Sequence, residues 1–229
     1  MLKETTNKFK ERLTTLTPTT KYCKICFKEI RNNDFARLFD SDICICAKCQ
    51  SEFEPKFISF RVNGYRASAI FEYTPYIKEL IYKYKGCFDY ELKDTFLNLY
   101  SKEIKMRYSG YKIVPIPSYI EDDKKRGFNH VVEMFKNLGL ECLPIIEKTA
   151  HFKQAEHKAR KRHEISKYLV LKEQIDLSKS KILIVDDIYT TGSTMKAAIN
   201  LVEKLNPKEI RVLVLAKTRT IPSENTNIY

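Results

Sequence analysis

The chain contains no tryptophan and only six glycines among its 229 residues. Glycines so few and so scattered form neither a Gly-x-x-x-x-Gly-Lys phosphate loop nor a Gly-x-Gly-x-x-Gly dinucleotide fingerprint. The sequence therefore gives no indication of a P-loop ATPase or of a dinucleotide-dependent enzyme.

Long apolar runs are also lacking. Residues 212–216, among the longest, have the length of a buried strand, far below the roughly 20 residues of a membrane-spanning helix. Residues 1–8 lack the apolar core of a secretory signal. We therefore expect a cytoplasmic protein, with the inner face of the cell membrane as an alternative place of action. Thiols stay reduced there, so the seven cysteines are expected to be metal ligands or bystanders.

Positive charge is in excess, since 41 Lys and Arg face 29 Asp and Glu and give a formal net charge of +12. This balance favours a polyanionic partner, such as nucleic acid, a phosphorylated substrate or an acidic membrane, without choosing among them. A composition of 43% hydrophobic and 31% charged residues indicates a globular chain. Its length fits one domain with a small appendage.

Hydrophobic periodicity predicts a mixed α/β domain. The Asn-Gly pair at 63–64, between strands at 60–62 and 65–67, is typical of a type I′ hairpin turn. Further expected elements are helices over 74–86, 92–104, 131–138 and 195–205, and strands at 113–114, 143–146, 182–185 and 212–215. Strand, helix and strand within about 35 residues form a βαβ unit, so the main sheet should be at least partly parallel.

Two Cys-x-x-Cys pairs, Cys23/Cys26 and Cys46/Cys49, are separated by 19 residues. This spacing is typical of a four-thiolate zinc site, in which two tight turns each present two sulfurs to a tetrahedral ion. Cys44 could replace one of the four ligands. Buried free thiols or a redox pair are the alternative interpretation.

Residues 21–55 hold five of the seven cysteines but have too little apolar content to fold by burial alone. Metal binding, on the order of 10–16 kcal/mol in zinc-finger peptides, could supply the missing stability. Four thiolates leave no open coordination position, so such a site is structural. The two remaining cysteines, Cys87 and Cys142, are expected in the core.

A strand that ends in two aspartates is the second informative motif. Residues 182–194 read Ile-Leu-Ile-Val-Asp-Asp-Ile-Tyr-Thr-Thr-Gly-Ser-Thr. Asp186 and Asp187 stand at the carboxyl end of the strand, where open α/β sheets bind ligands. The loop after them has donors that attract a phosphate at a helix N-terminus. The carboxylates suit sugar hydroxyls, or a Mg²⁺ that bridges a second phosphate. An ordinary βα loop with a solvated acidic pair is the alternative.

This string resembles the signature of the phosphoribosyltransferase family, which binds 5-phosphoribosyl 1-pyrophosphate. By that resemblance, Asp186 and Asp187 hold the ribose hydroxyls. The residues that would hold the 5′-phosphate are Thr190, Thr191, Gly192, Ser193 and Thr194.

The middle of the chain extends the resemblance. Pro115-Ile116-Pro117-Ser118 is followed by Lys124-Lys125-Arg126-Gly127-Phe128-Asn129-His130, then by Gln154 and a basic stretch. With the cysteine motif before and the aspartate motif after, this order resembles the ComF family of competence proteins, ComFC type, over about 22–219. The resemblance implies a type I phosphoribosyltransferase fold with an N-terminal zinc finger. It also implies a part in bringing single-stranded DNA into naturally transformable bacteria, with a helicase-like competence ATPase as partner. Two departures are His130, where many members have Gln, and the additional thiol of Cys44.

Further contacts follow from the same resemblance and from charge. The family places a pyrophosphate-contacting loop at Pro117, and Arg126 could contact the same group. The expected nucleic-acid contacts are Lys124, Lys125, Lys158, Arg160, Lys161 and Arg162. Residues 151–167 show no apolar stripe, so a merely solvated charged face is an equal alternative there. Tyr82 could stack on bases, whereas the spacing of Tyr84 predicts that it faces the core. No histidine lies near a Ser or Cys in a pattern that suggests a hydrolytic triad.

The sequence thus predicts a basic arm over 1–20, a zinc finger over 21–55, a phosphoribosyltransferase-like domain over 56–220 and a flexible tail over 221–229. Three functions stay open. The favoured one is a DNA-uptake protein that binds single-stranded DNA and, with Mg²⁺, phosphoribosyl pyrophosphate, with catalysis undecided. The others are an active phosphoribosyltransferase of nucleotide metabolism and a zinc-stabilised adaptor with a vestigial ligand site.

Overall fold

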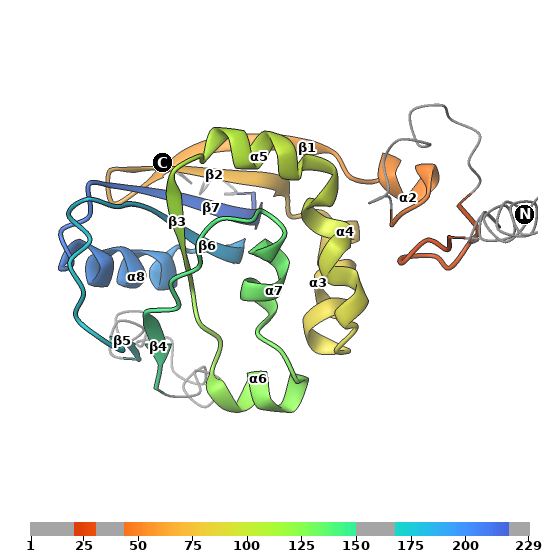
Figure 1. The fold of residues 1–229 in the computed structure, drawn as a ribbon. Helices are drawn as coiled ribbons and strands as arrows, with labels where there is room; N and C mark the ends of the chain where they lie inside the picture. Colours follow the sequence, from red (N-terminus) through yellow and green to blue (C-terminus); the bar gives the residue numbers. More distant parts are fainter. Residues whose placement is uncertain (1–20, 31–43, 150–167, 220–229) are drawn as a thin grey trace, which may run out of the picture.

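The computed structural model describes residues 21–30, 44–149 and 168–219 (Figure 1). Several predicted features lie outside these described residues. They are the basic arm 1–20, the tail 221–229, and the basic side chains of Lys158, Arg160, Lys161 and Arg162.

A five-stranded sheet with the strand order β1-β2-β7-β6-β3 forms the centre of the molecule. The strands are β1 Pro55–Val62, β2 Tyr65–Glu72, β3 Tyr111–Pro115, β6 Lys181–Tyr189 and β7 Glu209–Lys217. Only β1 and β2 pair antiparallel in this sheet, and the other three pairs are parallel. The expectation of an α/β fold with a largely parallel sheet is confirmed.

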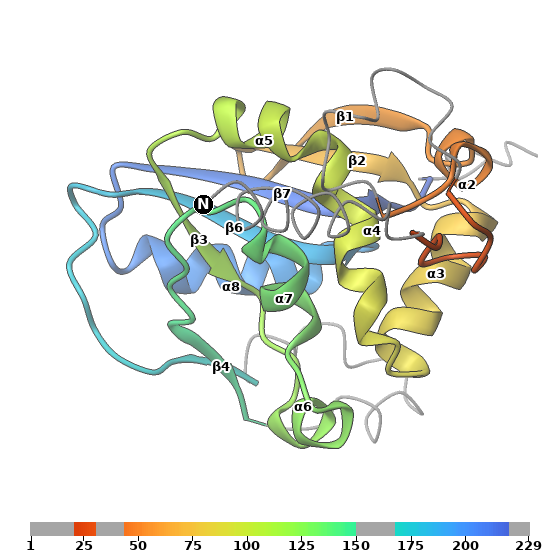
Figure 2. The same cartoon turned by 45° about the vertical axis from the view of Figure 1, so that its right-hand side comes forward.

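Helices cover both faces of the sheet (Figures 1 and 2). The helices are α2 Ala47–Ser51, α3 Pro75–Gly86, α4 Lys93–Leu97, α5 Ser101–Arg107, α6 Ile120–Arg126, α7 His130–Lys136 and α8 Ser193–Glu203. Alternate residues of β6 separate two cores: Ile184 packs with α8, whereas Leu183 and Val185 pack with α3, α4, α5 and α7. A second, two-stranded sheet pairs β4 Ile146–Lys148 with β5 Leu169–Leu171.

The predicted hairpin is confirmed in detail. Asn63 and Gly64 have φ angles of 48° and 81°, as a type I′ turn requires. The helix predicted from residue 74 begins at Pro75 with Thr74 as its N-cap, whose hydroxyl accepts a hydrogen bond from the amide of Ile77. Tyr84 is buried, as expected, and Tyr82 is exposed.

The predicted continuous helix over 92–104 is wrong. The chain forms four short pieces there: the 3₁₀ turns Tyr90–Leu92 and Asn98–Tyr100, and the helices α4 and α5. The hydroxyls of Thr95 and Ser101 donate to carbonyls three residues earlier, at Leu92 and Asn98. Side chains that bond to the backbone in this way compete with a regular helical ladder.

Two smaller predictions also fail. The strand expected at 143–146 begins only at Ile146, since Pro144 has no amide to donate to a ladder. Cys87 and Cys142 are exposed instead of lying in the core, because Cys87 is the residue that ends α3 and Cys142 contacts β3 through an isolated bridge. The helices among the described residues lack the length and apolarity that crossing a membrane requires.

Candidate functional site

The two aspartates lie at the carboxyl end of β6, in the interior of the sheet between β7 and β3. Asp186 is half-buried and Asp187 is 6% exposed. Because β3, β6 and β7 run parallel, their carboxyl ends meet at one edge of the sheet. This edge is where open α/β sheets bind ligands.

Asp187 is held by two basic side chains. Its Oδ2 lies 2.5 Å from Nζ of Lys85 and 3.1 Å from Nε2 of His130, and its Oδ1 accepts the amide of Ile188 at 2.7 Å. Burial by itself would raise the pKa of the Asp187 carboxyl, but Lys85 and His130 outweigh it and hold that pKa well below its usual range. Asp187 is therefore ionised and already partnered.

Asp186 is shifted in the opposite direction. Burial raises the pKa of its carboxyl well above the usual value, and the negative charge of Asp187 raises it further. One Asp186 oxygen accepts the Asp187 amide at 2.8 Å. The two adjacent carboxyls thus differ in their affinity for a proton. Asp186 is the one whose protonation would respond to a ligand bound beside it.

His130 links Asp187 to two further groups. Its Nδ1 lies 3.2 Å from Nη1 of Arg126 and 3.0 Å from Oγ of Ser118. A guanidinium only donates, so Nδ1 is the acceptor and the neutral ring donates from Nε2 to Asp187. Ser118, His130 and Asp187 are therefore connected in the order of a hydrolytic triad, an arrangement that the sequence did not indicate. Arg126 competes with Ser118 for the same ring nitrogen.

Arg126, a predicted pyrophosphate contact, points into the protein. Its side chain is 9% exposed and bonds to the backbone oxygen of Lys85 at 3.0 Å and to the carboxylate of Asp123 at 2.9 Å. Arg126 thus contacts Lys85 and His130, the two residues that bond to Asp187, and does not contact the aspartates itself. Its role as a direct ligand contact stays a prediction.

The loop between β6 and α8 has the features expected of an anion site. Gly192 is the N-cap of α8 with a φ of 76°, and an added Cβ would collide with the Tyr189 hydroxyl. Glycine carries no capping side chain, so the first amides of the 11-residue helix α8 have no cap acceptor. The hydroxyls of Thr191 and Ser193 lie 3.1 Å apart beside them. Thr190 is exposed and Thr194 is half-buried in the first turn of the helix.

The other predicted contacts lie on the segment that follows β3. Pro117 lines a separate cavity of about 150 Å³, which neither aspartate lines. Lys124 is exposed, with its Nζ 2.8 Å from Glu121, and Lys125 is exposed on the same helix. Pro117 lies two residues beyond Pro115, which pairs with Val185 of β6, so it stands at the same edge of the sheet as the aspartates. Lys124 and Lys125 lie further along the chain, on α6.

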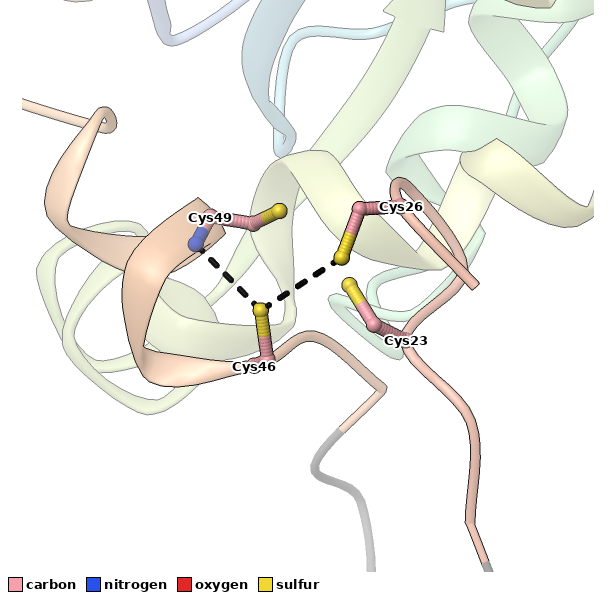
Figure 3. Close-up of side chains that lie close together, drawn as sticks. All are labelled: Cys23, Cys26, Cys46 and Cys49. Carbon is pink, nitrogen blue, oxygen red and sulfur yellow. Dashed lines mark hydrogen bonds between the residues drawn. The ribbon is translucent and has the colours of Figure 1, made fainter. Parts of the chain in front are cut away.

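The four cysteines of the two pairs form one cluster (Figure 3). Their sulfurs all lie within 4.8 Å of one another, and those of Cys26 and Cys46 are 3.7 Å apart. Sulfurs that surround a tetrahedral zinc at about 2.3 Å would be about 3.8 Å apart. The cluster therefore fits a metal ion of that size, and all seven cysteines are free thiols.

Backbone amides stabilise the thiolate form of one ligand of this cluster, Cys23. Burial would raise the pKa of the Cys23 thiol, but hydrogen bonds from the backbone at Cys46, Cys26 and Ile25 lower it to about 7. The Cys49 amide also donates to the Cys46 sulfur at 3.5 Å. Burial and the neighbouring cysteines raise the pKa of the Cys49 thiol, so Cys23 is the ligand that the protein itself favours as a thiolate.

Cys44 is not part of the cluster. Its sulfur lies 3.6 Å from the backbone oxygen of Asp94, and burial raises the pKa of its thiol to about 11. The alternative in which Cys44 replaces a ligand finds no support in this geometry, and the ligand set stays at four.

Comparison with known proteins agrees with this architecture. The phosphoribosyl transferase domain family matches residues 124–226. The competence protein ComFC of Streptococcus pneumoniae is 26% identical over 220 residues, which cover 85% of this chain and 99% of that protein. This is a ComFC-like chain with a phosphoribosyl transferase domain.

Two solved structures are similar to the ComFC-like chain. A purine phosphoribosyltransferase from Pyrococcus horikoshii is 20% identical, with 57% of this chain and 78% of that chain covered and a TM-score of 0.35. A hypoxanthine phosphoribosyltransferase from Staphylococcus aureus is 11% identical, with 55% and 62% covered and a TM-score of 0.34.

Sequence reasoning missed Lys85 as a member of the site in the ComFC-like chain. This residue lies in the last turn of α3, 102 positions before Asp187. His130 stood out as a departure from the family pattern. The sequence does show that Lys85 is a cation at the end of an amphipathic helix. It does not show that Asp187 is its partner, because that depends on how α3 packs against β6.

Proposed function

We propose that the ComFC-like chain binds phosphoribosyl pyrophosphate, with Mg²⁺, at the end of β6 and binds single-stranded DNA during DNA uptake. The observation that carries the proposal is the acidic pair beside an uncapped helix. The pKa values of the Asp186 and Asp187 carboxyls are shifted in opposite directions. The N-terminus of α8 follows them within a few residues. A sugar phosphate has groups suited to both parts.

The phosphate end is assigned to the loop residues 190–194. Amides of the first turn of α8, the positive end of its dipole and the loop hydroxyls attract an anion. The left-handed Gly192 opens the helix without placing a side chain over those amides.

The ribose end is assigned to the acidic pair. Lys85 and His130 already bond to Asp187, so Asp186 is the carboxyl that would meet ribose hydroxyls or Mg²⁺. Bound Mg²⁺ would offset the charge of the pyrophosphate. Lys85 and His130 would keep Asp187 ionised, and Arg126 would hold His130 in place.

The cysteine cluster is assigned to structural zinc. Two observations support this occupant: the spacing of the sulfurs and the hydrogen bonds that backbone amides donate to them. The described part of the chain also offers no fifth ligand to the cluster. Zinc would fix the N-terminal segment against the main domain, to which Lys24 is joined through Asp94 at 2.7 Å.

The DNA-binding part rests on the net charge of +12 and on the likeness to a competence protein. A helicase-like ATPase of the same system is the proposed protein partner. The basic side chains Lys124 and Lys125 are exposed and could contact phosphates, although Lys124 also pairs with Glu121.

Both ligands should be measured on one zinc-loaded sample, separately and in competition. Phosphoribosyl pyrophosphate at 100 times its Kd should stabilise the fold by about 2.7 kcal/mol, which a thermal shift detects. DNA affinity should fall with salt, with a log–log slope of about −0.7 per phosphate neutralised. The absence of both effects would overturn the proposal.

One observation favours a second candidate, a vestigial ligand site. Asp187 is already satisfied by Lys85, His130 and a backbone amide, so the fold does not need a ligand there. An adaptor of this kind gives no thermal shift with phosphoribosyl pyrophosphate. Turnover to pyrophosphate with a nitrogen acceptor would instead assign an active phosphoribosyltransferase.

A further inference from the structure

Three arginines stand side by side across the sheet at its other end. Arg61 of β1 pairs with Arg66 of β2, and Arg66 pairs with Arg211 of β7. Directly paired positions project from the same face of a sheet. Arg211 also pairs with Leu183, so the three arginines share the face that α5 and its neighbours cover.

A hollow of about 550 Å³ lies over this row of arginines. Its lining comprises Ser59, Phe60, Arg61, Arg66, Ala67, Ser68, Arg107, Tyr108 and Arg211. The fourth arginine, Arg107, comes from the last turn of α5, which lies beside β1 in both views (Figures 1 and 2). We call this surface the arginine hollow, and no acidic residue is among its described lining.

The charges in the arginine hollow are only partly compensated. Glu209 lies 2.8 Å from Arg211, and Glu103 lies 3.0 Å from Arg107. Arg61 donates to the backbone oxygen of Gly64, which adds no negative charge. The Arg66 side chain has no hydrogen bond or ion pair within residues 21–30, 44–149 and 168–219.

Such a row is unfavourable for the sheet alone. Like charges directly opposite each other on neighbouring strands destabilise the pairing. Arg61 and Arg66 are both exposed, and only Arg61 has a described structural bond for its guanidinium, to Gly64. An anion that binds between them would remove the repulsion, so the arrangement suits a bound ligand better than an empty surface.

The arginine hollow is distinct from the sugar-phosphate site. Arg66 and Arg211 lie near the amino ends of β2 and β7, whereas Asp186 lies near the carboxyl end of β6. Asp186 pairs with Val214, which is three residues beyond Arg211, or about 10 Å along the strand. The two sites can therefore bind different ligands at once.

The dimensions favour a chain of phosphates. Neighbouring strands are about 4.8 Å apart, so three arginines span about 10 Å, a distance that two or three successive phosphates of one strand can match. Guanidinium groups bind phosphate oxygens through paired hydrogen bonds. Ser59 pairs with Ser68 two residues further along each strand, on the same face, and their hydroxyls add donors.

We propose that the arginine hollow binds the phosphodiester backbone of single-stranded DNA. This inference rests on the DNA-binding part of the proposed function and gives it a surface at the amino ends of the parallel strands. The DNA would then lie at the amino ends of the parallel strands, and phosphoribosyl pyrophosphate at their carboxyl ends.

The test uses the zinc-loaded full chain, a fluorescent oligothymidine and a salt series. Arg66→Gln removes a charge without a partner in the described structure, and Arg61→Gln is combined with it in a double variant. Lys204→Gln, at the exposed end of α8 on the other face, removes the same charge as a matched control. The salt slope should become shallower by about 0.7 in the single and 1.4 in the double variant. The control should keep the wild-type affinity, and every variant should keep its thermal shift with phosphoribosyl pyrophosphate.

Three outcomes would overturn the inference. A double variant with wild-type slope and affinity would exclude the arginine hollow while leaving the proposed function standing. Wild-type protein without DNA binding would remove both. Inorganic triphosphate that displaces the oligonucleotide at equal phosphate concentration would assign the hollow to a compact anion instead of a strand.

Discussion

Lys85 and Asp187, 102 positions apart in the chain, meet with 2.5 Å between Nζ and Oδ2. The contact joins the last turn of α3 to the end of β6. It keeps Asp187 ionised, whereas the pKa of the adjacent Asp186 is shifted in the opposite direction. It positions the candidate site before any ligand arrives.

Replacement of each aspartate should therefore have opposite effects on the free protein. Asp187→Asn leaves Lys85 without its counter-charge and should lower the free energy of unfolding by about 1–2 kcal/mol, a value reduced because the Lys85 side chain is 37% exposed. Asp186→Asn removes a half-buried carboxyl and its repulsion with Asp187 and should leave stability equal or higher. Urea unfolding at pH 7 compares the two. A larger loss in Asp186→Asn would contradict the assigned charges.

The same pair predicts the pH dependence. The pKa of Asp187 is lowered in the fold, so its stabilisation is complete above the unfolded pKa of about 4 and is lost as pH falls below that value. The pKa of Asp186 is raised, so its cost is present at neutral pH and is relieved as pH falls through the folded pKa toward 4. The stability gap between wild type and Asp186→Asn should narrow between pH 7 and pH 4. If this stability difference instead widened on acidification, the pKa of Asp186 would have to be lowered in the fold, contrary to the assignment.

Gly192 and Gly127 give a matched pair of glycine substitutions. Both have positive φ, at 76° and 86°, so alanine should cost about 1–2 kcal/mol at either position. Only at Gly192 does the new Cβ also collide with Tyr189, whereas it meets open space at Gly127. Gly192→Ala should thus lose more stability and the phosphoribosyl pyrophosphate shift as well, as thermal melts would measure. Equal effects of the two substitutions would argue against a special role of the loop.

Zinc content should depend on four cysteines and not on the fifth. Cys46→Ser should reduce bound zinc from about one per chain to well below that value, because a tetrahedral site loses one of four thiolates. Cys44→Ser should keep full zinc content, since its sulfur lies against Asp94. Elemental analysis of dialysed protein distinguishes the two. Loss of zinc in Cys44→Ser would move Cys44 into the ligand set.

Local patterns predicted the parts of the molecule that depend on neighbouring residues. The Asn63-Gly64 hairpin turn, the strand that carries Asp186 and the paired cysteines followed from spacing and turn chemistry, although that strand continues to Tyr189. These features need no knowledge of the sheet order. Where side chains could bond to the backbone, as at Thr95, local pattern failed and the predicted helix broke into pieces.

Features that depend on strand order could not be predicted in the same way. The row of Arg61, Arg66 and Arg211 exists only because β2 lies between β1 and β7 in one particular register. The bond from Lys85 to Asp187 likewise requires α3 to pack beside β6. A single sequence contains these residues but not the pairing that brings them together.

The most direct test of the central claim is the thermal shift of the zinc-loaded chain with phosphoribosyl pyrophosphate and Mg²⁺, measured for wild type and Asp186→Asn. The account predicts a clear upward shift for wild type, equivalent to about 2.7 kcal/mol at 100 times the Kd, and its loss in a variant that folds at least as stably. A shift absent from wild type, or unchanged in Asp186→Asn, would contradict it.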